Sequence, residues 1–145
     1  MHSNRSANLG LLVLRVTAGI IFAMHGGQKL FQAGLPRFAT LLTNLGVPAP
    51  SVAAVLVALV EFVGGVLLVL GLFVRPAAAL VAIDMVVALL GVHLRRGFFN
   101  PGGIEFPLIL LAANLALVCL GAGAWSMDGW LHSDRAGSGQ SRPVL

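Results

Sequence analysis

The residues that could do chemistry begin with a cation inside an apolar segment. Arg15 lies within an apolar run that starts near Leu9, and the same segment ends at His25 and Lys29. At 100° per residue on a helix, Arg15, His25 and Lys29 fall within one arc of about 80°. Hydrocarbon cannot satisfy polar side chains, so this stripe must face partners inside the protein.

Two carboxylates, Glu61 and Asp84, lie inside other apolar runs and are the expected partners of the stripe. An uncompensated Arg or Asp in the middle of a membrane helix costs about 2.5–3.5 kcal/mol on insertion scales, so we expect pairing. Counting residues from the predicted helix ends places Arg15 and Asp84 at the most similar depths. We therefore predict that these two pair, with Glu61 lying between them and His25.

This pairing leaves one carboxylate over. It must be protonated, or paired with a cationic His25 or with Lys29, and Glu61 with His25 is therefore a candidate proton-handling pair. The alternative is that the ion network only fixes helix register. Both interpretations stay open for the predicted buried polar network, which consists of Arg15, His25, Glu61 and Asp84.

A second polar cluster is expected at the membrane interface opposite the termini, beside the loop 97–103. It consists of Lys29, His93, Arg95 and Glu105. It could bind an anionic group or a partner protein, or its basic residues could only reach the lipid headgroups. His25 and His93 lack ligand spacing and Cys119 is the single cysteine, so no metal site is predicted.

The composition places these residues in a membrane. The chain has 145 residues, of which 58% are hydrophobic and 10% charged, with a mean hydropathy of +0.96, whereas soluble domains carry about 25% charged residues. Long unbroken apolar runs favour helices over the alternating strands of a barrel. We predict an all-α integral membrane protein with four transmembrane helices, at about residues 9–27, 52–73, 76–94 and 105–123.

The predicted segments outside the spans are short. Residues 1–8 are a polar N-terminal tail, and residues 132–145, rich in Ser, Gly and Arg, predict a disordered tail. Residues Pro36 to Leu45, followed by Gly46, predict a short interfacial helix in the first loop. Four spans place both termini on one side. The basic residues divide evenly between the sides, so they do not orient the chain, and their positions at the span ends favour headgroup contact over nucleic-acid binding.

Small residues four positions apart predict where the helices pack against one another. Such alanine pairs occur at positions 54 and 58, 78 and 82, and 112 and 116. On the last two spans, the acidic residues Asp84 and Glu105 share a stripe with small residues. We expect both stripes to face other helices.

Several motifs together resemble the DoxX family of small bacterial membrane proteins. They are RVTAGIIFAMHGGQKL in the first span, EFVGGVLLVLGLFVR in the second, VHLRRGFF ending the third, GGIEFPLILL opening the fourth, and a late SMD. The resemblance covers about residues 9–131, and its motif glycines fall on Gly26, Gly64, Gly65 and Gly103. Asp84 departs from the pattern, because many relatives carry Asn there.

The resemblance implies a four-helix protein of the bacterial inner membrane. Some family members are subunits of membrane oxidoreductases, including a thiosulfate:quinone oxidoreductase, which makes a quinone- or sulfur-linked complex the first interpretation. No covalently bound cofactor is expected, and quinone is the candidate cofactor. A non-enzymatic adaptor or chaperone for a partner protein and an oligomeric small-solute transporter are the alternatives. Besides the lipid bilayer, a protein partner or a homo-oligomer is expected. Cargo receptors among the distant relatives suggest cytoplasmic termini.

Overall fold

The structure is a computed structural model that describes residues 2–32 and 34–131, and this part of the chain consists of helices joined by short loops, without strands. The helices in order are α1 (His2–Phe31), α2 (Gly34–Asn44), α3 (Pro50–Leu70), α4 (Val74–Ala88) and α5 (Glu105–Leu120). α4 continues directly into a π-helical turn, Leu89–His93, and a 3-10 turn, Leu94–Arg96. The predicted disordered tail, 132–145, lies outside the described residues.

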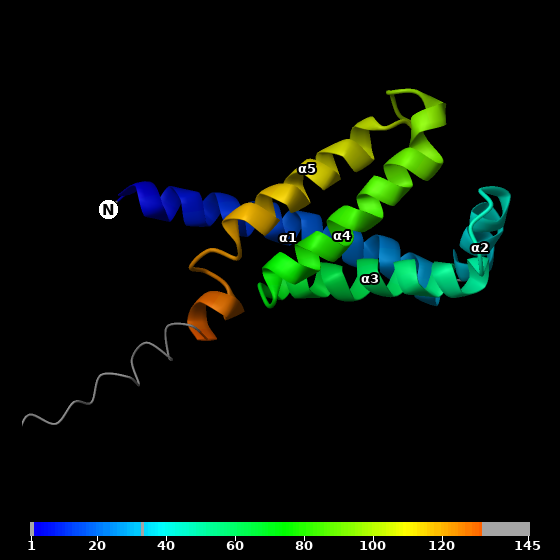
Figure 1. The fold of residues 1–145 in the computed structure, drawn as a ribbon. Helices are drawn as coiled ribbons and strands as arrows, with labels where there is room; N and C mark the ends of the chain where they lie inside the picture. The colour runs from blue at the N-terminus through cyan, green and yellow to red at the C-terminus, as the bar shows by residue number, and fades with distance from the viewer. Residues whose placement is uncertain (1, 33, 132–145) are drawn as a thin grey trace, which may run out of the picture.

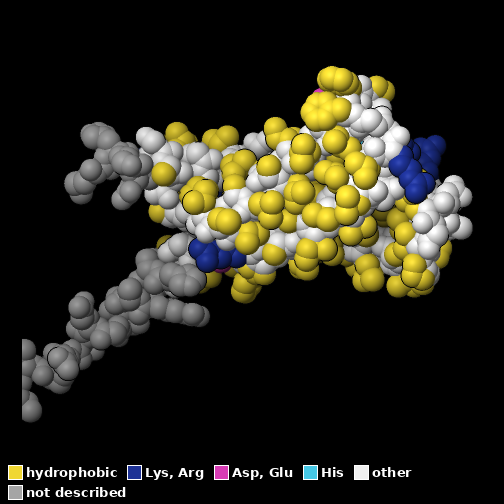
Figure 2. Space-filling model, turned by 45° about the horizontal axis from the view of Figure 1, so that its top comes forward, with side chains coloured by type: hydrophobic (Ala, Val, Ile, Leu, Met, Phe, Trp, Pro, Cys, Tyr) yellow, Lys and Arg dark blue, Asp and Glu magenta, His cyan; other side chains and the backbone are white. Residues whose placement is uncertain are grey.

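Three helical segments are long and apolar enough to cross a membrane: Arg5–Phe31, Pro50–Leu70 and Val74–Arg96. The fourth apolar helix, α5, has 16 residues and is shorter than the predicted span 105–123. It ends early because Gly121 adopts a φ of 80° and a ψ of −160°, a non-helical conformation that is accessible mainly to glycine. Figure 2 shows apolar side chains over the middle of the molecule and Lys and Arg near its two ends, as a membrane protein requires.

The first helix is longer than expected at both ends. α1 begins at His2, not at Leu9, so residues predicted to form a separate polar tail belong to the helix. The Asn8 side chain ties this extension to the end of the chain, because its Oδ1 accepts a hydrogen bond from the Ala124 amide at 2.9 Å. α2 matches the predicted short helix within two residues at each end, and Gly46 follows it with a φ of 73°.

Two helix pairs form the bundle. α1 packs along α3, α4 packs along α5, and α3 joins the pairs through its tight hairpin with α4. In Figure 1 the α4–α5 pair diverges from the α1–α3 pair towards the end of the molecule that carries α2. Both described chain ends lie at the opposite end.

Glycines let α1 and α3 approach closely. A Cβ added at Gly26 would overlap the backbone of Phe62, and a Cβ at Gly65 would overlap the backbone of Ala23. Gly64 faces the other neighbour of α3, because its Cβ would lie 2.7 Å from the Val81 side chain on α4. These motif glycines are therefore explained by helix packing.

The alanine pairs give a mixed result. The predicted alanines of α3 and α4 are buried, with Ala58 and Ala78 fully inaccessible. The prediction for α5 is wrong: Ala112 is exposed, and the buried face of this helix is formed by Pro107, Leu110, Asn114 and Leu117. α5 turns its larger apolar side chains inward because two core clusters, around Leu68 and around Phe22, need that volume filled.

Candidate functional site

Arg15 lies towards the end of the bundle that carries the two described chain ends. Its side chain is only 2% exposed, and Nη2 donates a hydrogen bond of 2.8 Å to the Trp125 carbonyl. Asp128 is its electrostatic partner. The predicted Arg15–Asp84 pair is therefore wrong. Depth along a helix does not reveal the segment 121–131, which folds back over this end and reaches the guanidinium first.

Asp128 holds the same end together from the other side. Its two carboxylate oxygens accept hydrogen bonds from the Phe73 amide at 2.9 Å and the Val74 amide at 3.0 Å, and its own amide donates to the Gly71 carbonyl at 2.9 Å. A carboxylate here caps the first turn of α4, where unpaired amides and the helix dipole favour negative charge. We call Arg15, the α3–α4 turn and the segment 121–131 the clasp end.

The remaining buried charges meet at the opposite end, on three helices. The Lys29 ammonium of α1 forms an ion pair with Glu61 of α3, which is 5% exposed. Asp84 of α4 interacts electrostatically with both Glu61 and Lys29. Of the two cations predicted for the surplus carboxylate, Lys29 is the one observed. The prediction that His25 belongs to a buried network is wrong, because His25 is exposed. Its ring neighbour is Phe106, with ring centroids 6.3 Å apart.

A cavity of about 490 Å³ opens beside these charges and is lined by all five helices and the π-helical turn. Apolar side chains form most of its wall, including Phe22, Met85 and Leu110. α2 closes one side with Phe38, whose ring centroid lies 4.5 Å from the Lys29 Nζ. The polar residues of the wall are His25, Lys29, Asn44, Glu61, Asp84, His93 and Arg95. We call this region the cavity end.

The residues of the predicted interfacial cluster have two different structural roles. His93 and Arg95 line the cavity. Glu105 instead holds the loop before α5, because its Oε1 accepts a hydrogen bond of 2.7 Å from the Asn100 amide. His93 Nδ1 lies 2.7 Å from the Gly102 carbonyl of that loop, and a Cβ at Gly103 would overlap the backbone of Phe98 and Phe99. The loop is therefore fixed in shape against the cavity mouth.

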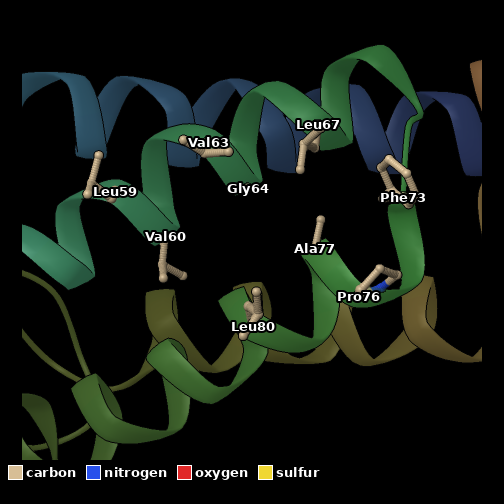
Figure 3. A pocket seen from close by; sticks show the side chains of 9 residues that line it. All are labelled: Leu59, Val60, Val63, Gly64, Leu67, Phe73, Pro76, Ala77 and Leu80. Carbon is tan, nitrogen blue, oxygen red and sulfur yellow. The ribbon is translucent and has the colours of Figure 1, made fainter.

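Another pocket, of about 330 Å³, lies between α3 and α4 (Figure 3). Leu59, Val63, Leu67 and Leu80 are among the apolar side chains that line it, and no ionisable residue does. It offers room for a hydrocarbon chain and nothing for acid–base or redox chemistry. Among the described residues, no group of three or more His, Cys, Asp or Glu side chains could hold a metal ion.

Sequence reasoning missed two features of these sites. The pocket wall supplied by Phe38 was not foreseen, although α2 was predicted. The capping role of Asp128 was also missed, although the residue belongs to the late SMD motif. An acidic residue in a Gly- and Ser-rich turn just after the last span was the available signal, since such turns commonly cap a neighbouring helix.

The chain is similar to several known bacterial membrane proteins. The family model described as DoxX matches residues 10–94. A Bacillus subtilis protein named "Putative oxidoreductase CatD" is 35% identical over 125 residues, which cover 86% of this chain and 89% of that protein. "Inner membrane protein YphA" of Escherichia coli is 31% identical, covering 81% and 87%. An uncharacterized membrane protein of Mycobacterium tuberculosis is 33% identical, covering 81% and 78%. No solved structure matches.

Proposed function

The chain belongs to the DoxX family of membrane proteins, and we propose that it is a subunit of a membrane oxidoreductase complex whose cavity receives a quinone-type carrier. The observation that carries this proposal is the cavity of about 490 Å³ with a Lys29–Glu61–Asp84 cluster on its wall. The name of the Bacillus subtilis relative supports the same class of activity. The names of other relatives support a bacterial inner membrane as its location.

The cavity fits a small lipophilic ring. Ligand pockets typically measure about 300–1,000 Å³ and combine an apolar wall with a few placed polar groups. Here Phe22, Met85 and Leu110 give the apolar wall, while Asp84 and His93 give polar positions on one side. A head group could lie among these residues with its hydrocarbon tail directed towards the lipid.

A quinone-type carrier supplies two-electron chemistry that is coupled to two protons. In the proposal, this chain handles the protons and a partner subunit handles the electrons. The Glu61 and Asp84 carboxyls are electrostatic neighbours on the cavity wall, and carboxyl groups can act as general acids or bases. Lys29 forms the ion pair with Glu61. The cluster can thus give or take a proton next to the bound ring.

The test measures bound quinone in the purified protein. Gly91 lines the cavity and a Cβ there meets no atom within 4 Å, so Gly91→Trp should fill the cavity mouth without disturbing the helix. Gly10→Trp is the matched control, because Gly10 also has nothing within 4 Å but lies in the first turns of α1, away from the cavity. We expect quinone at near-stoichiometric amounts in the wild type and the control, and a loss of about tenfold in Gly91→Trp, as an affinity change of 1.4 kcal/mol gives.

The two alternative functions give different results in the same preparation. A stoichiometric partner protein with no quinone in either preparation would favour an adaptor. Solute uptake into proteoliposomes, abolished by Gly91→Trp, would favour a transporter. Either result, or equal quinone in Gly91→Trp and Gly10→Trp, would contradict the proposal.

A further inference from the structure

The wall of the cavity reaches the outer surface of the bundle between α3 and α4. Val57 of α3 and Val87 of α4 line the cavity there, and Val87 is 59% exposed. The apolar pocket of about 330 Å³ begins at Val60 and Leu80 of the same two helices (Figure 3). Resting on the proposed function, we infer that the carrier approaches the cavity from the bilayer, between α3 and α4, and that the pocket there holds its hydrocarbon tail.

The cavity and the pocket share one side of α3 and of α4. At 100° per residue, Val57, Val60 and Gly64 of α3 fall within one arc of about 60°. Leu80 and Val87 of α4 fall within about 20° of each other. Val57 and Val87 line the cavity, and the other three residues line the pocket. The pocket therefore follows the cavity along the seam between α3 and α4, towards the turn that joins them.

Apolar side chains from both helices enclose the pocket. In Figure 3, Val60 of α3 points towards α4, and Ala77 of α4 points back towards α3. Gly64 and Ala77 are buried, so small residues line the inner part of the pocket, whereas Leu80 is 55% exposed at its outer edge. The lining residues of α3 lie within 59–67, a segment that rises about 12 Å. This shape suits a hydrocarbon chain that lies along the helices.

Phe73 lines the other end of the pocket, beside the turn between α3 and α4. Its backbone φ of 49° is left-handed, which is a strained conformation for a bulky residue. The Asp128 side chain stabilises this conformation by accepting a hydrogen bond of 2.9 Å from the Phe73 amide. Strained residues that are held by other groups commonly have a functional role. Here the strain places an aromatic ring where the tail would end.

The different walls of the cavity and the pocket select the class of ligand. The cavity provides charged and polar side chains for a head group, including Lys29, Glu61 and His93, whereas no ionisable residue of the described chain lines the pocket. A ring with a long hydrocarbon tail matches both spaces, and a small water-soluble sulfur compound would leave the pocket unused. Lipid tails are as apolar as the pocket, so the tail gains only packing contacts there and its contribution to affinity is modest.

The first experiment compares two probes on the purified full chain: a benzoquinone with a decyl tail, and the same ring with a methyl group in place of the tail. Leu80→Trp fills the pocket, and Ile83→Trp is the matched control, because Ile83 is similarly exposed on α4 but lines neither space. We expect Leu80→Trp to weaken binding of the decyl compound about fivefold, through lost packing contacts, and to leave the methyl compound unchanged. Ile83→Trp should change neither. All variants share one detergent, so partition of the tail into micelles cancels.

A photoreactive probe measures where the tail lies. The decyl quinone carries a diazirine at the end of its tail, and mass spectrometry locates the labelled residues. We expect the label within residues 59–80, which contain the whole lining of the pocket. Gly91→Trp should remove this label, because the head group can no longer occupy the cavity, whereas Gly10→Trp should retain it.

Each outcome bears on a different claim. Equal binding of the decyl compound to Leu80→Trp and Ile83→Trp, or a label outside residues 59–80, would contradict the tail site and leave the cavity as the ligand site. A label that persists in Gly91→Trp would show that the pocket takes up any bilayer chain independently of the cavity, and would also contradict the inference. Failure of both quinones to bind the wild type would contradict the proposed function as well.

Discussion

The charged side chains at the two ends of the bundle have different kinds of partner. At the clasp end, Arg15 and Asp128 are tied to backbone groups of segments far apart in the chain. At the cavity end, Lys29, Glu61 and Asp84 contact mainly one another and line an open space of about 490 Å³. Charges bonded to the backbone fix the fold, whereas charges bonded to other side chains beside a cavity can change partner or protonation without moving a helix.

The largest expected loss of stability comes from a substitution at the clasp end. Arg15→Leu removes the hydrogen bond to Trp125 and leaves Asp128 without its buried cation, which should cost about 2–3 kcal/mol of unfolding free energy. We expect several-fold less folded protein in membranes, measured by size exclusion after detergent extraction. Arg5→Gln, at an exposed position of the same helix, is the control. Equal accumulation of both variants would refute the structural role of Arg15.

The second prediction concerns the close contact between α1 and α3 at Gly26. Gly26→Ala places a methyl group against the backbone of α3 and should destabilise the protein by about 1–3 kcal/mol, as overpacking does. Gly10→Ala on the same helix meets no atom within 4 Å and should be neutral or slightly stabilising. The readout is the midpoint of thermal unfolding in detergent. A similar midpoint for both variants would show that α1 and α3 are less closely packed than described.

A smaller effect is expected from the cap of α4. Asp128→Ala removes the acceptor of two backbone amides and should cost about 1 kcal/mol, as the loss of a helix cap typically does. Faster amide hydrogen exchange in the first turn of α4, with unchanged exchange in α2, is the expected signature. Uniform exchange changes along the chain would instead indicate global loss of stability.

The smallest effect on stability is predicted at the cavity end. Glu61→Gln keeps a hydrogen-bond acceptor for Lys29 and leaves Asp84 as a nearby carboxylate, so the unfolding free energy should change by less than about 1 kcal/mol. Glu61→Leu, which removes the polar contact entirely, should destabilise more. If Glu61→Gln were as unstable as Arg15→Leu, the prediction that charges at the clasp end stabilise the fold more than those at the cavity end would be wrong.

Much of the architecture followed from hydropathy and from single residues. The apolar runs and the short helix predicted from Pro36 to Leu45 each carry their own local signal, and the structure has a helix at each of these places. Arg15 and Glu61 are buried as predicted, whereas His25 of the predicted buried network is exposed. The partner of Arg15 was predicted wrongly, because pairing depends on how far each helix extends and on what folds back over its ends.

Arg15 illustrates the limit. Its depth in the first span matched Asp84, yet the group it reaches is a backbone carbonyl at Trp125, 110 residues later. Every residue has a backbone carbonyl, so no sequence pattern predicts which one will accept this hydrogen bond. Lys29 shows the converse: its long side chain reaches back from the helix end to Glu61, and only the close α1–α3 packing allowed by glycines brings the two together.

The length of α5 has a consequence for the surrounding bilayer. Sixteen residues rise about 24 Å, whereas the hydrocarbon layer is about 30 Å thick. A span this short is accommodated by local thinning of the bilayer, by flanking side chains that reach the headgroups, or by oligomerisation. The side of the bundle formed by α5 is therefore where the protein places the strongest demand on its surrounding lipid or on a neighbouring subunit.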